Sequence, residues 1–328
     1  MIQPGPKNLI TDVAGLLVGH ATNVDARTGV SVMLLPGGWT AAADVRGGGP
    51  ATREIEVLGL ANLVGRAHAL VFSGGSVFGL AAADGVTVAL SARDEGLRLG
   101  TEPHAIPIVV GACLHDLSNG GDKAWGTTPP YRSLGMEAVE KASEMFDLGA
   151  VGAGCGAMAG TAKGGIGSAS LDLGDGLVVG ALAAVNPVGS VYVDTEGRFF
   201  AAPFEWGTEF GGRRAGSASL HDPLPLDSKL SRFASAKPGA ATTLCAVAVS
   251  ADLSGPECQR VAMMAQDGLA RAIRPAHTPF DGDLVICAAS GTTGLGSQGR
   301  AFQVARLGTA AADVLARAIA RGVYAAEG

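Results

Sequence analysis

Short apolar runs that end at glycine or proline recur along the chain and predict β-strands. The segments alternate with turn residues at short intervals, as strands of a compact sheet do. The pattern predicts strands at 8–20, 28–36, 69–73, 106–112, 177–186, 189–193, 242–249 and 284–289, and a polar turn at 44–49. The runs 177–186 and 189–193 are expected to pair as a hairpin.

Apolar positions at helical spacing predict helices between these strands. The last helix, at about 302–325, is rich in alanine and amphipathic, and another is expected at 257–274, where Ser254 can cap the first turn and Pro256 suits it. Helices are also expected over 77–92 and 134–146. The mixture of hairpins and helices favours an α+β layered fold over a strictly alternating, doubly wound one.

Two segments differ from the rest of the chain. Residues 149–170 are almost all glycine, alanine or other small residues, and Lys163 is their only charge. Residues 203–240 are polar and rich in glycine, proline and serine, which predicts a loop or linker. This loop leads directly into the strand that begins at Thr242.

Charge and composition narrow the classes of partner. The 328 residues carry a net charge of −6 without a basic run, so neither nucleic acid nor an anionic membrane is expected as a partner. The first residues resemble no signal peptide, and no apolar run is long enough to span a bilayer, so we expect a cytoplasmic protein. The five cysteines lack CxxC spacing and are expected to be buried, reduced thiols.

Several motifs are weak on their own. The spacing Gly154-x-Gly156-x-x-Ala159 fits a loose dinucleotide fingerprint but follows an expected helix instead of a strand. His277, Asp281 and Asp283 are a minor candidate for a metal site. The chain has no GxSxG elbow for a serine triad. We therefore expect neither a cofactor nor a metal.

Ordered segments along nearly the whole chain resemble one protein family. They are NLITDVAGLLVGHAT, DVRGGGPATRE, SGGSVFGLAAADGV, AKGGIGSAS, AAVNPVG, TTLCAVAVSADLS and DGLARAIRPAHTPFDGD. Together they resemble the DmpA-like aminopeptidases, a family of L-aminopeptidase/D-esterases and β-aminopeptidases, and are especially similar to its nylon-oligomer (6-aminohexanoate) hydrolase branch. The resemblance implies a four-layer αββα sandwich.

The resemblance also implies self-processing. The precursor would cleave itself between Ala241 and Thr242, so that residues 1–328 form a single self-processing hydrolase domain of an α chain, 1–241, and a β chain, 242–328. Thr242 would then be the nucleophile. Its new α-amine, with a pKa of about 7.7–8.0, can accept the hydroxyl proton near neutral pH.

The other site residues follow from the same resemblance. Lys163 matches the family's active-site lysine, and Asn186 matches the asparagine that donates to the oxyanion. Asp281 and Asp283 match the acidic pair of the nylon-hydrolase branch and could hold the new ammonium. His115 stands where that branch has a tyrosine, at a possible substrate-pocket position.

Each of these residues also has a purely structural interpretation. Lys163 could cap carbonyls in a glycine-rich turn, Asn186 could serve an Asn-Pro turn, and the two aspartates could form an Asp-Gly turn before the strand at 284. The family pattern favours the catalytic roles only because all of the residues match together.

Three functions are compatible with the sequence. The first is an amide hydrolase acting through an acyl-enzyme on Thr242, with peptides, amino amides or ω-amino-acid oligomers as substrates. The second is an acyltransferase of the ornithine acetyltransferase type, which shares the bond Ala241-Thr242. The third is an uncleaved, noncatalytic binding protein. For the first we expect a homo-oligomer of cleaved αβ protomers.

Overall fold

The computed structural model describes residues 2–213, 227–230 and 241–328 of the chain. Its main sheet has the strand order β3-β5-β4-β2-β11-β10-β9-β8, with β1 paired to β2. The strands are β1 (Leu17–Asn23), β2 (Thr28–Val45), β3 (Thr52–Arg53), β4 (Arg66–Ser73), β5 (Val109–Cys113), β8 (Gly165–Asp172), β9 (Val178–Asn186), β10 (Thr242–Ala251) and β11 (Leu284–Thr293). A separate two-stranded sheet pairs β6 (Met158–Ala159) with β7 (Ala162–Lys163).

The long strand β2 joins two stacked halves of the main sheet. Its first part pairs with β1 and β4, and its second part pairs with β11. The register with β4 shifts between Leu34 and Trp39, where the strand passes from one layer to the other. Two sheet layers are thus built on one continuous strand.

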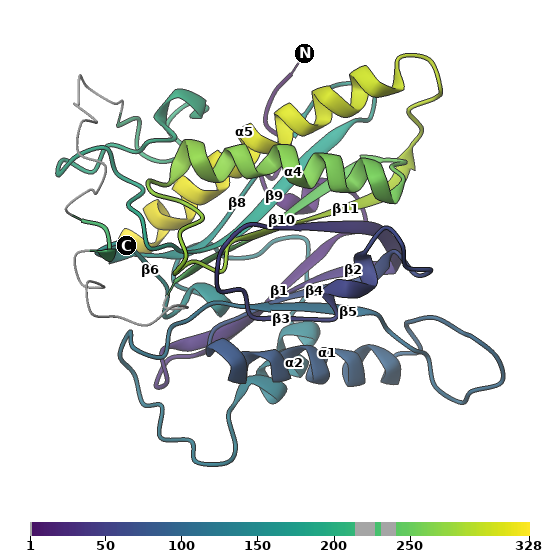
Figure 1. Ribbon diagram of the computed structural model, residues 1–328, viewed down its shortest axis with the longest axis horizontal. Helices are drawn as coiled ribbons and strands as arrows, with labels where there is room; N and C mark the ends of the chain where they lie inside the picture. Colours follow the sequence, from purple (N-terminus) through teal and green to yellow (C-terminus); the bar gives the residue numbers. More distant parts are fainter. Residues whose placement is uncertain (1, 214–226, 231–240) are drawn as a thin grey trace.

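Helices cover the outer face of each sheet layer (Figure 1). The helices α4 (Gly255–Ala272) and α5 (Arg300–Glu327) pack on β8 to β11, whereas α1 (Ala81–Ala92) and α2 (Tyr131–Glu140) cover the layer of β1, β2, β4 and β5. A third group of buried residues fills the space between the sheets. The expected α+β, four-layer αββα sandwich is confirmed.

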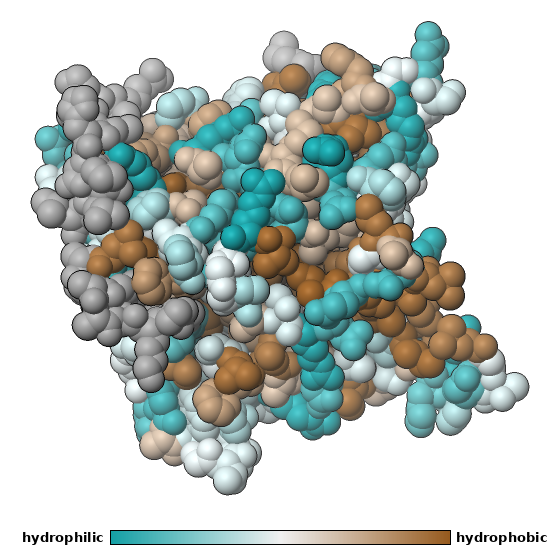
Figure 2. Space-filling model, in the orientation of Figure 1, coloured by the Kyte–Doolittle hydropathy of each residue, from teal (hydrophilic) through white to brown (hydrophobic). Residues whose placement is uncertain are grey.

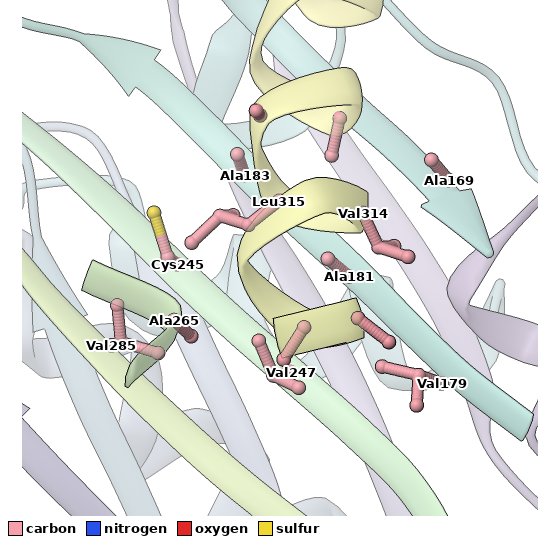
Figure 3. Close-up of a cluster of buried hydrophobic side chains, with 14 of the residues drawn as sticks. Ala169, Val179, Ala181, Ala183, Cys245, Val247, Ala265, Val285, Val314 and Leu315 are labelled. Atoms are coloured by element: carbon pink, nitrogen blue, oxygen red, sulfur yellow. The ribbon is translucent and has the colours of Figure 1, made fainter. Parts of the chain in front are cut away.

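Strand periodicity divides the central strands between two cores. In β9, Val179, Ala181 and Ala183 face α4 and α5 (Figure 3), whereas Leu182 and Ala184 face the opposite sheet. Successive residues of a strand point to opposite faces, and both faces here are covered. This explains why the strand sequences are continuously apolar instead of alternating.

Most of the predicted elements are present, with shifted ends. The helix capped by Ser254 is confirmed, with a capping box to Glu257 and proline in its first turn. The predicted strand at 189–193 is wrong: this segment makes only isolated bridges, and β9 pairs instead with β8 and β10. The polar turn predicted at 44–49 begins later, because β2 continues to Val45. Most of the expected loop 203–240 lies outside the described residues.

The surface combines polar helices with some exposed apolar residues. Figure 2 shows hydrophobic residues gathered on one side of the displayed face, between the two helix layers. Large apolar side chains that are exposed include Leu60, Leu63 and Phe302. Among the described residues, no helix is long and apolar enough to cross a membrane.

Helix α5 approaches β8 so closely that only glycine fits at the contact. A Cβ atom on Gly167 would lie 1.8 Å from the carbonyl oxygen of Ala318 and 2.5 Å from the nitrogen of Gly322. Both neighbours are backbone atoms of α5, which cannot give way without moving the helix. The small residues of this segment therefore set the distance between helix and sheet.

We predict that Gly167→Ala lowers the free energy of unfolding by about 1–3 kcal/mol, the usual cost of overpacking a rigid core. Denaturant unfolding measures the change. Gly294→Ala is the matched control, because a Cβ there would meet its nearest atom at 3.9 Å. Equal stability of the two variants would contradict the packing argument.

Candidate active site

The register of three neighbouring strands brings distant segments together at one end of the sheet. Thr242, the first residue of β10, lies directly opposite Asn186, the last residue of antiparallel β9. On the other side β10 runs parallel to β11, and Ala241 forms a bridge with Asp281 just before that strand. The predicted nucleophile, asparagine and acidic pair therefore meet at one place.

The Ala241-Thr242 bond is buried and its carbonyl is held from two sides. Ala241 is fully buried, and Thr242 is only 2% exposed. The Thr242 Oγ lies 2.5 Å from the Ala241 carbonyl oxygen, and the N–H of Gly282 donates to the same oxygen at 3.0 Å. Two donors on one carbonyl oxygen polarise the carbonyl and make its carbon more electrophilic.

Asp281 is a buried carboxylate that accepts several hydrogen bonds. The Val188 N–H donates to its Oδ1 at 2.9 Å, and the Thr278 N–H and hydroxyl donate to its Oδ2 at 2.9 and 2.6 Å. Burial nevertheless raises the pKa of Asp281 to about 6, and the nearby negative charge of Asp283 adds to the rise. The carboxyl therefore titrates close to neutral pH.

Asp283 connects the start of β10 with the preceding loop. The N–H of Thr243 donates to its Oδ1 at 2.8 Å. The backbone N–H of His277 donates to its Oδ2 at 2.9 Å, and the His277 Nδ1 lies 3.0 Å from the same oxygen. The two aspartates thus act first as acceptors for the backbone around the buried bond, so the predicted Asp-Gly segment is not merely a turn.

Asn186 is fully buried, and its carboxamide has a defined orientation. The N–H of Met158 and the ammonium of Lys229 donate to its Oδ1, at 2.9 and 3.2 Å. Its Nδ2 donates to the carbonyl oxygen of His115 at 3.0 Å. An amide nitrogen carries two protons, so one remains to stabilise an anionic oxygen nearby.

The remaining predicted residues lie at the edge of this group. The side chain of Lys163 is exposed, and its strand partner is Met158, which holds Asn186. His115 is half-buried, and burial lowers the pKa of its imidazole; the charge of Asp116 opposes this shift, whereas that of Lys229 adds to it. Thr242, Asn186, Asp281 and Asp283 are thus brought together, and the ammonium of Lys163 is not buried among them.

Sequence reasoning missed three contributors to the site. Lys229 lies in the polar segment predicted to be a loop or linker, where a single lysine carries no signal. Gly282 contributes only its backbone N–H, which a sequence cannot reveal. His277 was considered only as a metal ligand, yet it hydrogen-bonds to Asp283. Among the described residues, no three His, Cys, Asp or Glu side chains are grouped to hold a metal ion.

The chain is similar to known proteins over nearly its whole length. The model of peptidase family S58 matches residues 8–328. An uncharacterized aminopeptidase of Mycobacterium tuberculosis is 39% identical over 336 aligned residues, which cover 98% of this chain and 94% of the relative. A 6-aminohexanoate-oligomer endohydrolase of a Kocuria species is 30% identical, and the match covers 95% of this chain and 84% of that enzyme.

Solved structures show the same fold. A Burkholderia β-aminopeptidase superposes with a TM-score of 0.69 at 24% identity, covering 98% of this chain and 88% of that one. An L-aminopeptidase D-Ala-esterase/amidase from Ochrobactrum anthropi, described as a variant of the Ntn hydrolase fold, gives a TM-score of 0.67 at 19% identity. That match covers 99% of this chain and 88% of the other.

We predict that Asp283→Asn lowers the pKa of Asp281, because it removes the neighbouring negative charge that opposes ionisation. Carboxyl ¹³C NMR measures this pKa. Asp252→Asn, at a half-exposed carboxylate outside the site, is the control. An Asp281 pKa that stays the same in both variants would refute electrostatic coupling of the pair.

Proposed function

Because the chain belongs to peptidase family S58 and is a hydrolase of peptide or amide bonds, we propose that it cuts itself before Thr242 and then uses Thr242 as an N-terminal nucleophile. One observation carries the proposal. The Thr242 hydroxyl and the Gly282 N–H converge on the carbonyl oxygen of Ala241, at 2.5 and 3.0 Å. The attacking group and the polarising donor thus flank the same bond.

Self-cleavage proceeds in two steps. The Thr242 oxygen forms a bond to the Ala241 carbonyl carbon, the carbon–nitrogen bond breaks, and the hydroxyl proton passes to the nitrogen. The resulting ester is then hydrolysed by water, which leaves a carboxylate on Ala241 and a free amine and hydroxyl on Thr242. The Gly282 N–H stabilises the negative charge that develops on the carbonyl oxygen during the attack.

The same threonine then works on external amides. Its α-amine takes the hydroxyl proton as the oxygen attacks the substrate carbonyl. The ammonium then gives this proton to the leaving nitrogen as the carbon–nitrogen bond breaks, which leaves an acyl group on the Thr242 oxygen. Water hydrolyses the acyl-enzyme. Asn186 lies opposite Thr242 in the register and has an amide proton for the oxyanion.

The charged residues adjust the new amine. Asp281 and Asp283, buried beside the start of β10, stabilise the ammonium form that arises when the amine takes the proton. Lys163, on β7 opposite Met158, supplies a positive charge to the site. We assign the half-buried imidazole of His115 to the substrate-binding part of the site, where it would contribute to the choice of substrate.

We propose peptides, amino amides or ω-amino-acid oligomers as substrates. The relatives support this class, since their names are aminopeptidase and 6-aminohexanoate-oligomer endohydrolase. We also propose that cleaved αβ protomers assemble as a homo-oligomer, for which the exposed apolar side chains Leu60, Leu63 and Phe302 offer contact area.

We predict that the purified protein consists of two fragments whose masses sum to the full chain plus one water, with the smaller beginning at Thr242. Intact-mass spectrometry under denaturing conditions tests this. Thr242→Ala removes the hydroxyl and should remain one full-length chain, with amidase activity reduced at least ~10³-fold.

Thr243→Val is the matched control for this variant. The Thr243 hydroxyl is buried and has no hydrogen-bond partner among the described residues, so its replacement by a methyl should leave cleavage intact. A cleaved and active Thr242→Ala protein would refute the mechanism. A wild-type chain that stays intact on incubation and hydrolyses none of a broad amide panel would favour the noncatalytic alternative.

The bond Ala241-Thr242 also favours a second candidate, acyl transfer of the ornithine acetyltransferase type. In that reaction an amine instead of water accepts the acyl group from Thr242. We expect hydrolysis to dominate, because the family and both named relatives are hydrolases or peptidases. Transfer of acetyl from acetylornithine to glutamate that exceeds hydrolysis would reverse the assignment.

A further inference from the structure

A second lysine, Lys229, lies inside the site although its segment was expected to be a linker. Its side chain is almost completely buried, with 7% of the residue exposed. The ammonium Nζ lies 3.2 Å from the Oδ1 of Asn186 and 3.3 Å from the backbone carbonyl oxygen of the same residue. One cation thus binds both oxygens of the residue opposite Thr242.

The backbone around Lys229 is anchored to the turn that follows β9. The Lys229 N–H donates to the Val188 carbonyl oxygen at 2.8 Å. Two residues earlier, the carboxylate of Asp227 accepts a hydrogen bond from the Ser190 hydroxyl. The same stretch lies so close to Gly160 that a Cβ there would be 2.4 Å from the Asp227 carbonyl oxygen. Hydrogen bonds and close packing of this segment therefore hold the Lys229 ammonium beside Asn186.

The charge of Lys229 affects the pKa of a neighbouring group of the site. It contributes to the lowered pKa of the half-buried His115, whose carbonyl oxygen accepts the Asn186 Nδ2. Asn186, His115 and Lys229 thus form one contiguous polar cluster. Lys163, in contrast, is exposed, and its strand partner Met158 donates a backbone N–H to Asn186.

We propose that Lys229 is a positioning residue that fixes and polarises the Asn186 carboxamide, so that its remaining amide proton is directed at the oxyanion. The two ends of a carboxamide have nearly the same shape, and hydrogen bonds decide which end faces which way. A charge-assisted donor on Oδ1 stabilises one orientation more strongly than a neutral one. It also draws electron density from the amide, which makes the N–H a better donor.

This proposal rests on the proposed function, in which Asn186 stabilises the oxyanion. The test uses the protein expressed from the whole sequence, after it has cleaved itself, and an amino-acid p-nitroanilide that the wild type hydrolyses. Loss of one oxyanion donor typically costs 10²–10³-fold in kcat, so we expect that range for Asn186→Ala. For Lys229→Met we expect about 10–100-fold lower kcat with KM changed less than about threefold, because a donor that is present but misdirected retains part of its effect.

A double-mutant cycle separates positioning from a merely structural role. If Lys229 acts through Asn186, Lys229→Met should cost little further activity in an Asn186→Ala background. Lys229→Arg, which keeps a buried cation and its donors, should restore most of kcat. The control Lys141→Met removes an exposed lysine at the C-cap of α2 and should leave kcat unchanged. A double variant whose loss of kcat equals the product of the two single losses would overturn the proposal. So would an unchanged kcat in Lys229→Met.

A readout without turnover distinguishes this inference from the proposed function. In the Thr242→Ala chain, the side-chain ¹⁵N amide signal of Asn186, assigned by its loss in Asn186→Ala, should shift and exchange faster with water when Lys229 becomes methionine. Lys141→Met should leave it unchanged. An unaltered signal in Lys229→Met would overturn the positioning role of Lys229, even if Thr242 proves to be the nucleophile. An altered signal would support the positioning role of Lys229, even if the wild-type protein proves not to cleave itself.

Discussion

The pairing of β10 between β9 and β11 is the constraint on which the rest of the site depends. One antiparallel neighbour ends at Asn186, and one parallel neighbour is preceded by Asp281 and Asp283. Shifting β10 by one residue would turn Thr242 to the other face of the sheet and bury the wrong set of side chains. Since both faces of the sheet are packed, the register is strongly specified, and the geometry around the Ala241 carbonyl follows from it.

The same pairing explains how two fragments could remain one protein. The segment from Thr242 onward contains β10, α4, β11 and α5, and its two strands lie between β2 and β9 of the preceding segment. The backbone hydrogen bonds between β9 and β10 and between β2 and β11 therefore join the two segments. In addition, α5 packs on β8 and β9 through small residues such as Gly167 and Gly322. A cut before Thr242 removes one covalent bond but leaves the shared core intact.

The charged groups of this site are stabilised by hydrogen bonds to the surrounding backbone. Asp281 and Asp283 accept hydrogen bonds from several N–H groups of the surrounding loops, and the ammonium of Lys229 binds carbonyl oxygens of Asn186. Buried charges without such partners would be costly, because a low-dielectric interior does not replace their hydration. The raised pKa of Asp281 shows that these hydrogen bonds do not fully offset burial and the nearby charge of Asp283.

The sequence by itself determined most of the element types, the α+β class and the family, because apolar periodicity, the cap at Ser254 and ordered motifs are local signals. The resemblance also pointed to Thr242, Asn186 and the acidic pair. The strand register of the folded protein brings these residues together. Only the tertiary structure decided that 189–193 is not a strand, since β9 takes β8 and β10 as partners. It alone revealed the Gly282 N–H and the buried ammonium of Lys229, because a backbone donor has no sequence signature and a lysine in a polar segment is buried only by long-range packing.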